Sequence, residues 1–129
     1  MNGSCLLDTN IVIALFAGDK KIIKHLEKVS DIRVPVIVAG ELLYGALNSV
    51  RSKNNLKTLE SFFQTVELIN CDTETALHYA QIKKNLKDKG KPIPENDIWI
   101  AALSFQYSLP LATRDSHFAQ IDNIKIEKW

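Results

Sequence analysis

Two acidic residues lie in segments that otherwise carry no charge. Asp8 is the only charged residue within positions 1–18, and Glu41 is the only one within positions 34–50. Both segments are apolar enough to be buried in a folded protein, and an ionised carboxylate is costly to bury unless a partner compensates its charge. These two residues are therefore candidates for chemistry.

Two further acids have a similar setting in the last third of the chain. Asp97 directly precedes the uncharged run 98–113, and Asp115 lies just beyond that run in the stretch LATRD. Asp8 and Asp115 each follow a predicted strand, and ligands bind beyond the carboxyl ends of parallel strands. Asp97 is predicted at a helix start and Glu41 in the second turn of a helix. We therefore expect all four carboxylates at one edge of a sheet.

Four neighbouring carboxylates repel one another, and a hard divalent cation compensates that repulsion. Carboxylate oxygens suit Mg²⁺ or Mn²⁺. The chain has no glycine-rich cofactor motif, so an acidic metal cluster points to phosphodiester hydrolysis, with the ions orienting water and neutralising charge on phosphate. Two-metal sites hold their ions about 3.5–4 Å apart, and the sequence leaves one ion or two open.

The elements that must position these acids alternate along the chain. Short apolar runs predict strands at 4–8, 32–34, 66–69, 111–113 and 124–128. Apolar residues at helical spacing predict helices at 11–18, 20–30, 36–50, 55–64, 74–89 and 97–108. Strands separated by helices imply an α/β fold in which helices cover both faces of a parallel sheet.

Composition limits the class of protein. With 129 residues the chain fits a single domain, 1–129. The net charge of +1 excludes a broad basic field, so any nucleic-acid contact must come from a local patch. Cys5 and Cys71 are too few for a disulfide framework or a zinc site. Without a signal-peptide pattern or an apolar run long enough to span a membrane, we expect a soluble cytoplasmic protein.

Each acid also has a purely structural interpretation. Asp8 could bond the amides of the next helix, Asp97 could be a helix N-cap, and Asp115 could form a turn or pair with Arg114. Helix capping does not explain Glu41. It accounts for each of the other acids separately and not for their shared setting. Their coincidence favours a functional site.

Other polar groups are weaker candidates. His117 is near Asp115, and a turn position explains it more simply than a role in the site. Five lysines most simply form the solvated face of a helix, and contact with RNA is the alternative. They are Lys83, Lys84, Lys87, Lys89 and Lys91.

Four motifs carry a resemblance to a known family: LLDTN near the start, GELLYGA, NDIWIAA and LATRD near the end. In order and spacing the sequence resembles the PIN-domain family, and more narrowly the VapC-type ribonuclease toxins of toxin–antitoxin modules. The resemblance implies a three-layer α/β/α sandwich with a mostly parallel, roughly five-stranded sheet. It also implies endoribonuclease activity dependent on Mg²⁺ or Mn²⁺.

By position, the resemblance assigns the family's acidic, metal-binding and catalytic quartet to Asp8, Glu41, Asp97 and Asp115. It also assigns supporting roles, toward the acids or the substrate phosphate, to four polar residues: Thr9, Asn10, Asn96 and Thr113.

The resemblance further implies a homodimer and a cognate antitoxin whose C-terminal segment lies over or near the acidic cleft. Apolar residues of the early helices are candidates to bind that segment, namely Leu15, Phe16, Ile22 and Ile23.

Two other functions remain as alternatives. A phosphatase or phosphotransferase using Asp8 as nucleophile would usually carry a second Asp at the position of Asn10. A non-catalytic Mg²⁺-binding module, either RNA-binding or receiver-like, is the second alternative. A receiver would need a phosphoacceptor after its third strand, where Asp72 is the one candidate. It would also carry an acidic pair at the end of strand one, where this chain has a single acid.

Overall fold

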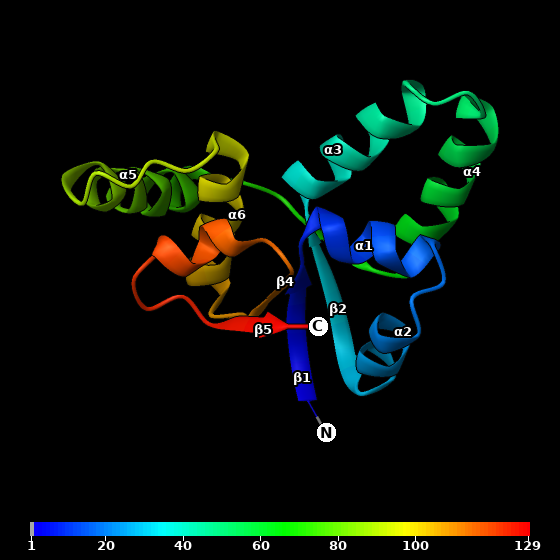
Figure 1. Ribbon diagram of the computed structural model, residues 1–129, viewed down its shortest axis with the longest axis horizontal. Coiled ribbons are helices and arrows are strands. Elements are labelled where there is room, and N and C mark those ends of the chain that lie inside the picture. The colour runs from blue at the N-terminus through cyan, green and yellow to red at the C-terminus, as the bar shows by residue number, and fades with distance from the viewer. Residues whose placement is uncertain (1) are drawn as a thin grey trace.

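A computed structural model describes residues 2–129 and contains a five-stranded, wholly parallel sheet (Figure 1). The strand order is β3-β2-β1-β4-β5. The strands are β1 (Asn2–Leu7), β2 (Val29–Pro35), β3 (Glu67–Ile69), β4 (Leu111–Thr113) and β5 (Ile126–Lys128). The α/β class expected from the sequence is confirmed.

The central strand β1 lies between β2 and β4. Its residues Leu6 and Leu7 have no exposed surface, because helices cover both faces of the sheet. Leu7 is in register with Ala112 of β4, and the amide of Asp8 donates to the Ala112 carbonyl at 3.0 Å. The ends of β1 and β4 are thereby fixed side by side, which brings Asp8 beside Thr113.

Helices form the two outer layers. They are α1 (Thr9–Phe16), α2 (Lys20–Glu27), α3 (Val36–Leu47), α4 (Ser52–Phe63), α5 (Thr73–Asp88) and α6 (Glu95–Tyr107). Figure 1 shows α5 and α6 on one side of the sheet and α1 to α4 on the other, with α3 and α4 projecting as an arm beyond its carboxyl edge. A short 3₁₀ helix, η1 (Ser116–Gln120), lies beside α6. The three-layer arrangement is also confirmed.

Helix α6 is the most deeply buried helix of the described chain. Residues 100–103 have no exposed surface, and with Asp97, Ile98 and Ser104 they bury more than half of the helix. Burying a large aliphatic side chain contributes about 1.5–3 kcal/mol each. The core therefore fixes the first turn of α6, which carries Asp97.

Several element boundaries differ from those the sequence predicts, those of α2 and α6 among them. The predicted helix 20–30 ends at Glu27, since Val29 pairs with β1 as the first residue of β2. Strand pairing outweighs the local helical pattern there. Helix α6 begins at Glu95 after Pro94, so Asp97 lies inside its first turn. Among residues 2–129, no helix is long and apolar enough to cross a membrane.

Candidate active site

Asp8 stands at the junction of β1 and α1 with both carboxylate oxygens engaged. The amide of Thr9 donates to its Oδ1 at 2.8 Å, and the hydroxyl of Thr113 donates to its Oδ2 at 2.6 Å. The residue is only 4% exposed. These contacts hold the carboxylate in one orientation, and they explain how a charge is tolerated at a buried strand end.

Thr113 connects Asp8 to the segment that carries Asp115. Its hydroxyl also accepts from the amide of Asp115 at 2.9 Å, and Thr113 itself is 1% exposed. Asp115 is the N-cap of η1, and its Oδ1 accepts from the amide of His117 at 2.9 Å. One threonine hydroxyl therefore sets the relative positions of two acids that are far apart in the sequence.

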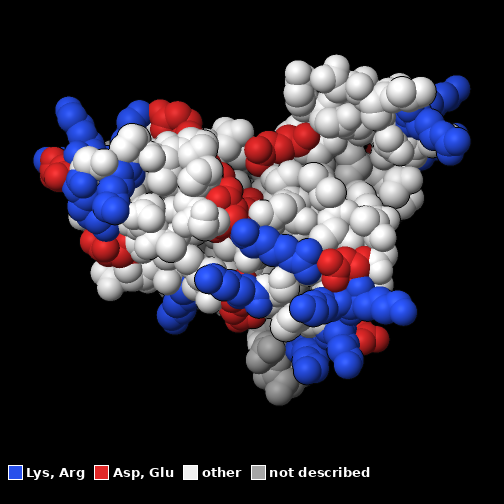
Figure 2. All heavy atoms as spheres, in the orientation of Figure 1, with Lys and Arg blue, Asp and Glu red and all other residues white. Residues whose placement is uncertain are grey.

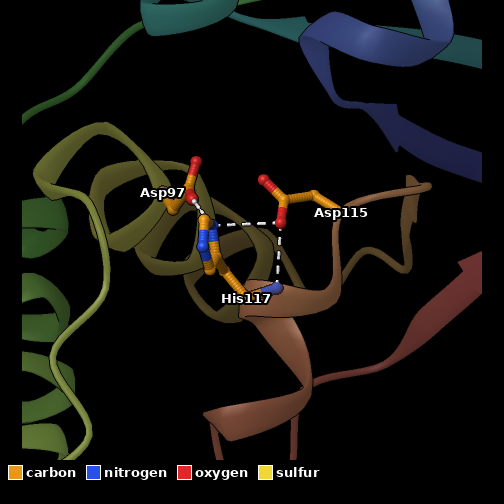
Figure 3. A group of neighbouring side chains, drawn as sticks. All are labelled: Asp97, Asp115 and His117. Carbon is orange, nitrogen blue, oxygen red and sulfur yellow. Dashed lines mark hydrogen bonds and ion pairs between the residues drawn. The ribbon is translucent and has the colours of Figure 1, made fainter.

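Asp97 meets this pair through His117 (Figure 3). Nδ1 of His117 lies 3.1 Å from Oδ2 of Asp97 and 3.0 Å from Oδ1 of Asp115. One donor atom from each of the three residues falls within 4.8 Å of the other two. The first turn of α6 and the segment after β4 thus converge on a small group of ligand atoms.

Glu41 is tied to the site through Thr9. The hydroxyl of Thr9 donates to Oε1 of Glu41 at 2.7 Å, and Glu41 is half-buried on the second turn of α3. Asn10 accepts from the amide of Arg114 at 3.3 Å, which joins α1 to the segment after β4. Asn96 is exposed, and within residues 2–129 its side chain has no recorded hydrogen bond. Three of the four predicted supporting residues therefore contact the acids or the backbone beside them.

The acids influence one another electrostatically. The pKa of Asp97 is raised to about 6, first by burial and then by the charges of Asp115 and Asp8, while His117 opposes the shift. Burial also raises the pKa of Asp8, against the hydrogen bonds from Thr113 and Thr9 and in concert with the charges of Asp115 and Glu41. Because Asp115 acts on both aspartates, these carboxylates share one site.

The donor set fits a divalent cation. Carboxylate oxygens with one imidazole nitrogen are ligands that Mg²⁺ or a first-row transition ion accepts. A cation at this position would compensate the burial and the repulsion from Asp115 and Asp8 that together raise the pKa of Asp97. Figure 2 shows acidic side chains gathered in the hollow between the two halves of this face, with lysines and arginines along its lower border.

The structural interpretations of the acids are true in part. Asp8 does bond the first amide of α1, and Asp115 does cap a turn. Asp97 is not an N-cap, because Pro94 occupies that position. Arg114 pairs with Asp19 at 2.9 Å rather than with Asp115.

The sequence favours a turn position for His117, and the structure places it in the 3₁₀ turn and also beside two acids. Its approach to two acids depends on the Asp115 cap that turns η1 back toward α6. In the sequence, the Asp-x-His spacing hints at this contact, but the hint is weak unless the 3₁₀ turn is known.

Comparison with known proteins agrees with this geometry. A family model, the PIN domain, matches residues 5–124. The chain belongs to the PIN-domain family. The resemblance carried by the four sequence motifs is therefore confirmed.

Individual PIN-domain relatives match over nearly the whole chain. The tRNA(fMet)-specific endonuclease VapC of Salmonella typhimurium is 32% identical over 127 residues, which covers 96% of each chain. The solved structure of DNA-bound VapBC from the same organism has a TM-score of 0.91 at 30% identity, covering 100% of this chain and 99% of that one. VapBC2 from Rickettsia felis, bound to a DNA fragment from its promoter, has a TM-score of 0.90 at 27% identity and covers 98% of each chain.

Proposed function

We propose that this PIN-domain protein is a divalent-metal-dependent endoribonuclease and acts as the toxin of a toxin–antitoxin module. The observation that carries the proposal is the convergence of Asp8, Asp97 and Asp115 from three distant segments, through the hydroxyl of Thr113 and the ring of His117. Glu41 joins them through Thr9. The relatives named as endonucleases support RNA as the substrate.

Different contacts hold the four acids in place, and these contacts suggest different roles in metal binding. Asp8, Asp97 and Asp115 would hold the metal, Mg²⁺ or Mn²⁺, with Glu41 binding it directly or through water. When bound, such an ion lowers the pKa of water and neutralises charge on the phosphate. Thr113 and the Thr9 amide keep Asp8 fixed, so that little reorganisation is needed as the reaction proceeds.

The proposed reaction is hydrolysis of one phosphodiester bond. A water oxygen forms a bond to phosphorus, one ester P–O bond breaks, and the leaving oxygen takes up a proton. The attacking water gives up a proton to bulk solvent or to one of the acids.

An apolar groove beside the acids suits a protein partner. It has a volume of about 490 Å³ and is lined by residues of α1, α3 and α4, among them Ile13, Phe16, Leu42 and Leu59. Glu41 also lines it, so an occupant would reach the metal-binding edge. The relatives solved as VapBC complexes support an antitoxin segment as that occupant. Ile22, one of the predicted contact residues, has no exposed surface and belongs to the core instead.

Homodimerisation and a cytoplasmic location remain predictions. Exposed apolar side chains on and after α3 support self-association, since Tyr44 is 69% and Leu47 is 64% exposed. Light scattering on the purified, antitoxin-free protein measures the oligomeric state directly.

The test of the proposed function is cleavage of a mixed RNA pool by antitoxin-free protein in Mg²⁺, in Mn²⁺ and in EDTA. Asp8→Asn serves as the inactive variant. Asp88→Asn serves as the matched control, because Asp88 is an exposed aspartate on α5 whose carboxylate pairs with Lys84. We expect metal-dependent cleavage by the wild type and by Asp88→Asn, and loss of cleavage in Asp8→Asn.

RNA binding without cleavage, by folded and metal-loaded protein, would contradict the proposal and favour the non-catalytic module. The receiver alternative has little support, because Asp72 is used locally as the N-cap of α5. Its Oδ1 accepts from the Thr75 amide at 3.1 Å and from the Gln106 amide group at 2.9 Å.

A further inference from the structure

We propose that His117 is a nitrogen ligand of the metal ion, and that it makes this site prefer Mn²⁺ and related transition ions over Mg²⁺. The inference rests on the proposed metal-dependent site and adds a fifth side chain to its four acids.

The position of the imidazole is the first argument. Nδ1 of His117 is 3.1 Å from an oxygen of Asp97 and 3.0 Å from an oxygen of Asp115 (Figure 3). A neutral imidazole carries at most one proton on that nitrogen, and one proton serves two carboxylates poorly. Two oxygens and one nitrogen that lie within 4.8 Å of one another are close enough to bind a shared ion.

The spacing of these donors matches a coordination shell. Ligands at right angles around an ion, each at about 2.1 Å, are separated by about 3.0 Å. The two nitrogen–oxygen separations at His117 agree with that value. Asp97, Asp115 and His117 would therefore occupy neighbouring positions around one ion with little movement.

The backbone explains why the ring is held there without help from the core. The amide of His117 donates to Asp115 Oδ1, the same oxygen that the ring approaches. The side chain is 50% exposed, and the adjacent Phe118 is the fully buried residue that anchors η1. Packing thus does not account for the direction of the imidazole.

A nitrogen ligand changes which ion is preferred. Mg²⁺ is best served by oxygen donors, whereas imidazole favours transition ions, whose affinities rise from Mn²⁺ through Co²⁺ to Ni²⁺. Loss of His117 should therefore weaken Mn²⁺ binding much more than Mg²⁺ binding. We expect a decrease of about 10-fold or more for Mn²⁺, with Mg²⁺ affinity altered by less than about 3-fold.

The test uses Mn²⁺ alone as the probe, with no RNA present. Pulsed electron paramagnetic resonance of the Mn²⁺-loaded protein detects a directly coordinated histidine nitrogen, and titration calorimetry gives the Mn²⁺ and Mg²⁺ affinities. The variant is His117→Gln, checked for folding by circular dichroism. The matched control is His78→Gln, since His78 is a partly exposed histidine on α5, beside Glu74.

The wild type and His78→Gln should show a coordinated nitrogen, and His117→Gln should lose that signal and most of its preference for Mn²⁺. Mn²⁺ bound without a nitrogen signal, or a signal unchanged in His117→Gln, would overturn the role of His117 and leave the nuclease proposal intact. Failure of Mn²⁺ to bind the wild type would overturn the metal-dependent site itself.

Discussion

Replacement of Asp97 by Asn should stabilise the metal-free protein while abolishing its cleavage of RNA. The residue is 9% exposed, and its pKa is raised from the usual 3.8 to about 6 by burial and by the charges of Asp115 and Asp8. Folding therefore disfavours the ionised form. Asn has nearly the same shape, keeps an acceptor oxygen for His117 and carries no charge.

The magnitude follows from linkage between protonation and folding. Because the pKa of Asp97 is higher in the folded protein than in the unfolded chain, ionisation of this group opposes folding. The wild type carries almost no penalty well below pH 3.8, and the penalty grows until the pH has passed about 6. At 1.36 kcal/mol per pH unit, the full penalty at pH 8 is about 3 kcal/mol. At pH 4 the group is only partly ionised even in the unfolded chain, so the penalty is about 0.5 kcal/mol.

Urea unfolding in EDTA at a series of pH values measures this effect. The stability difference between Asp97→Asn and the wild type should grow by about 2–3 kcal/mol from pH 4 to pH 8. Asp88→Asn is the control, because an exposed ion pair such as Asp88–Lys84 contributes at most about 1 kcal/mol. A difference that is independent of pH, or gross unfolding of the variant at pH 8, would refute the electrostatic reasoning and make Asp97 a structural residue.

Three further outcomes follow from the same contacts. Mn²⁺ at 100 times its dissociation constant should stabilise the wild type by about 2.7 kcal/mol in thermal unfolding at pH 8, and an equal gain in Asp97→Asn would place the ion elsewhere. Thr113→Val should destabilise the protein by about 1–3 kcal/mol and suppress cleavage, because Asp8 and the Asp115 amide lose their shared partner. Thr113→Ser keeps the hydroxyl and should retain both the stability and the cleavage activity. Equal losses in the two variants would mean that the methyl group matters instead. Phe16→Glu should weaken antitoxin binding in a pull-down and leave RNA cleavage unchanged, since Phe16 lines the groove and is 43% exposed. Leu77→Glu, an exposed leucine on α5, is its control, and equal binding by both variants would count against the groove.

The positions of the acids were predictable because charge is rare in buried segments. Asp8 and Glu41 are each the single charge of an apolar segment, Asp97 directly precedes another, and the strand order brings these acids to one edge. The parallel sheet itself follows from the sequence pattern, since short apolar runs separated by helices form parallel sheets. The five strands and six α-helices were predictable for that reason.

The details that depend on tertiary contacts were not predictable. The start of β2 at Val29 requires β1 as a partner. The burial of Ile22 depends on how α2 packs, and its neighbour Ile23 stays 40% exposed. The approach of His117 to Asp97 depends on a 3₁₀ turn set by one side-chain cap. Local sequence carries little information about any of these.

The most direct test of the account is the fate of a water oxygen during cleavage. RNA cleaved by the metal-loaded protein in ¹⁸O-labelled water is analysed by mass spectrometry at its new ends, before any further reaction. Hydrolysis at the acidic edge predicts a linear terminal phosphate that carries one ¹⁸O atom, in reactions that EDTA stops. A 2′,3′-cyclic phosphate without ¹⁸O would show attack by the neighbouring ribose hydroxyl, and it would contradict a site built to activate water.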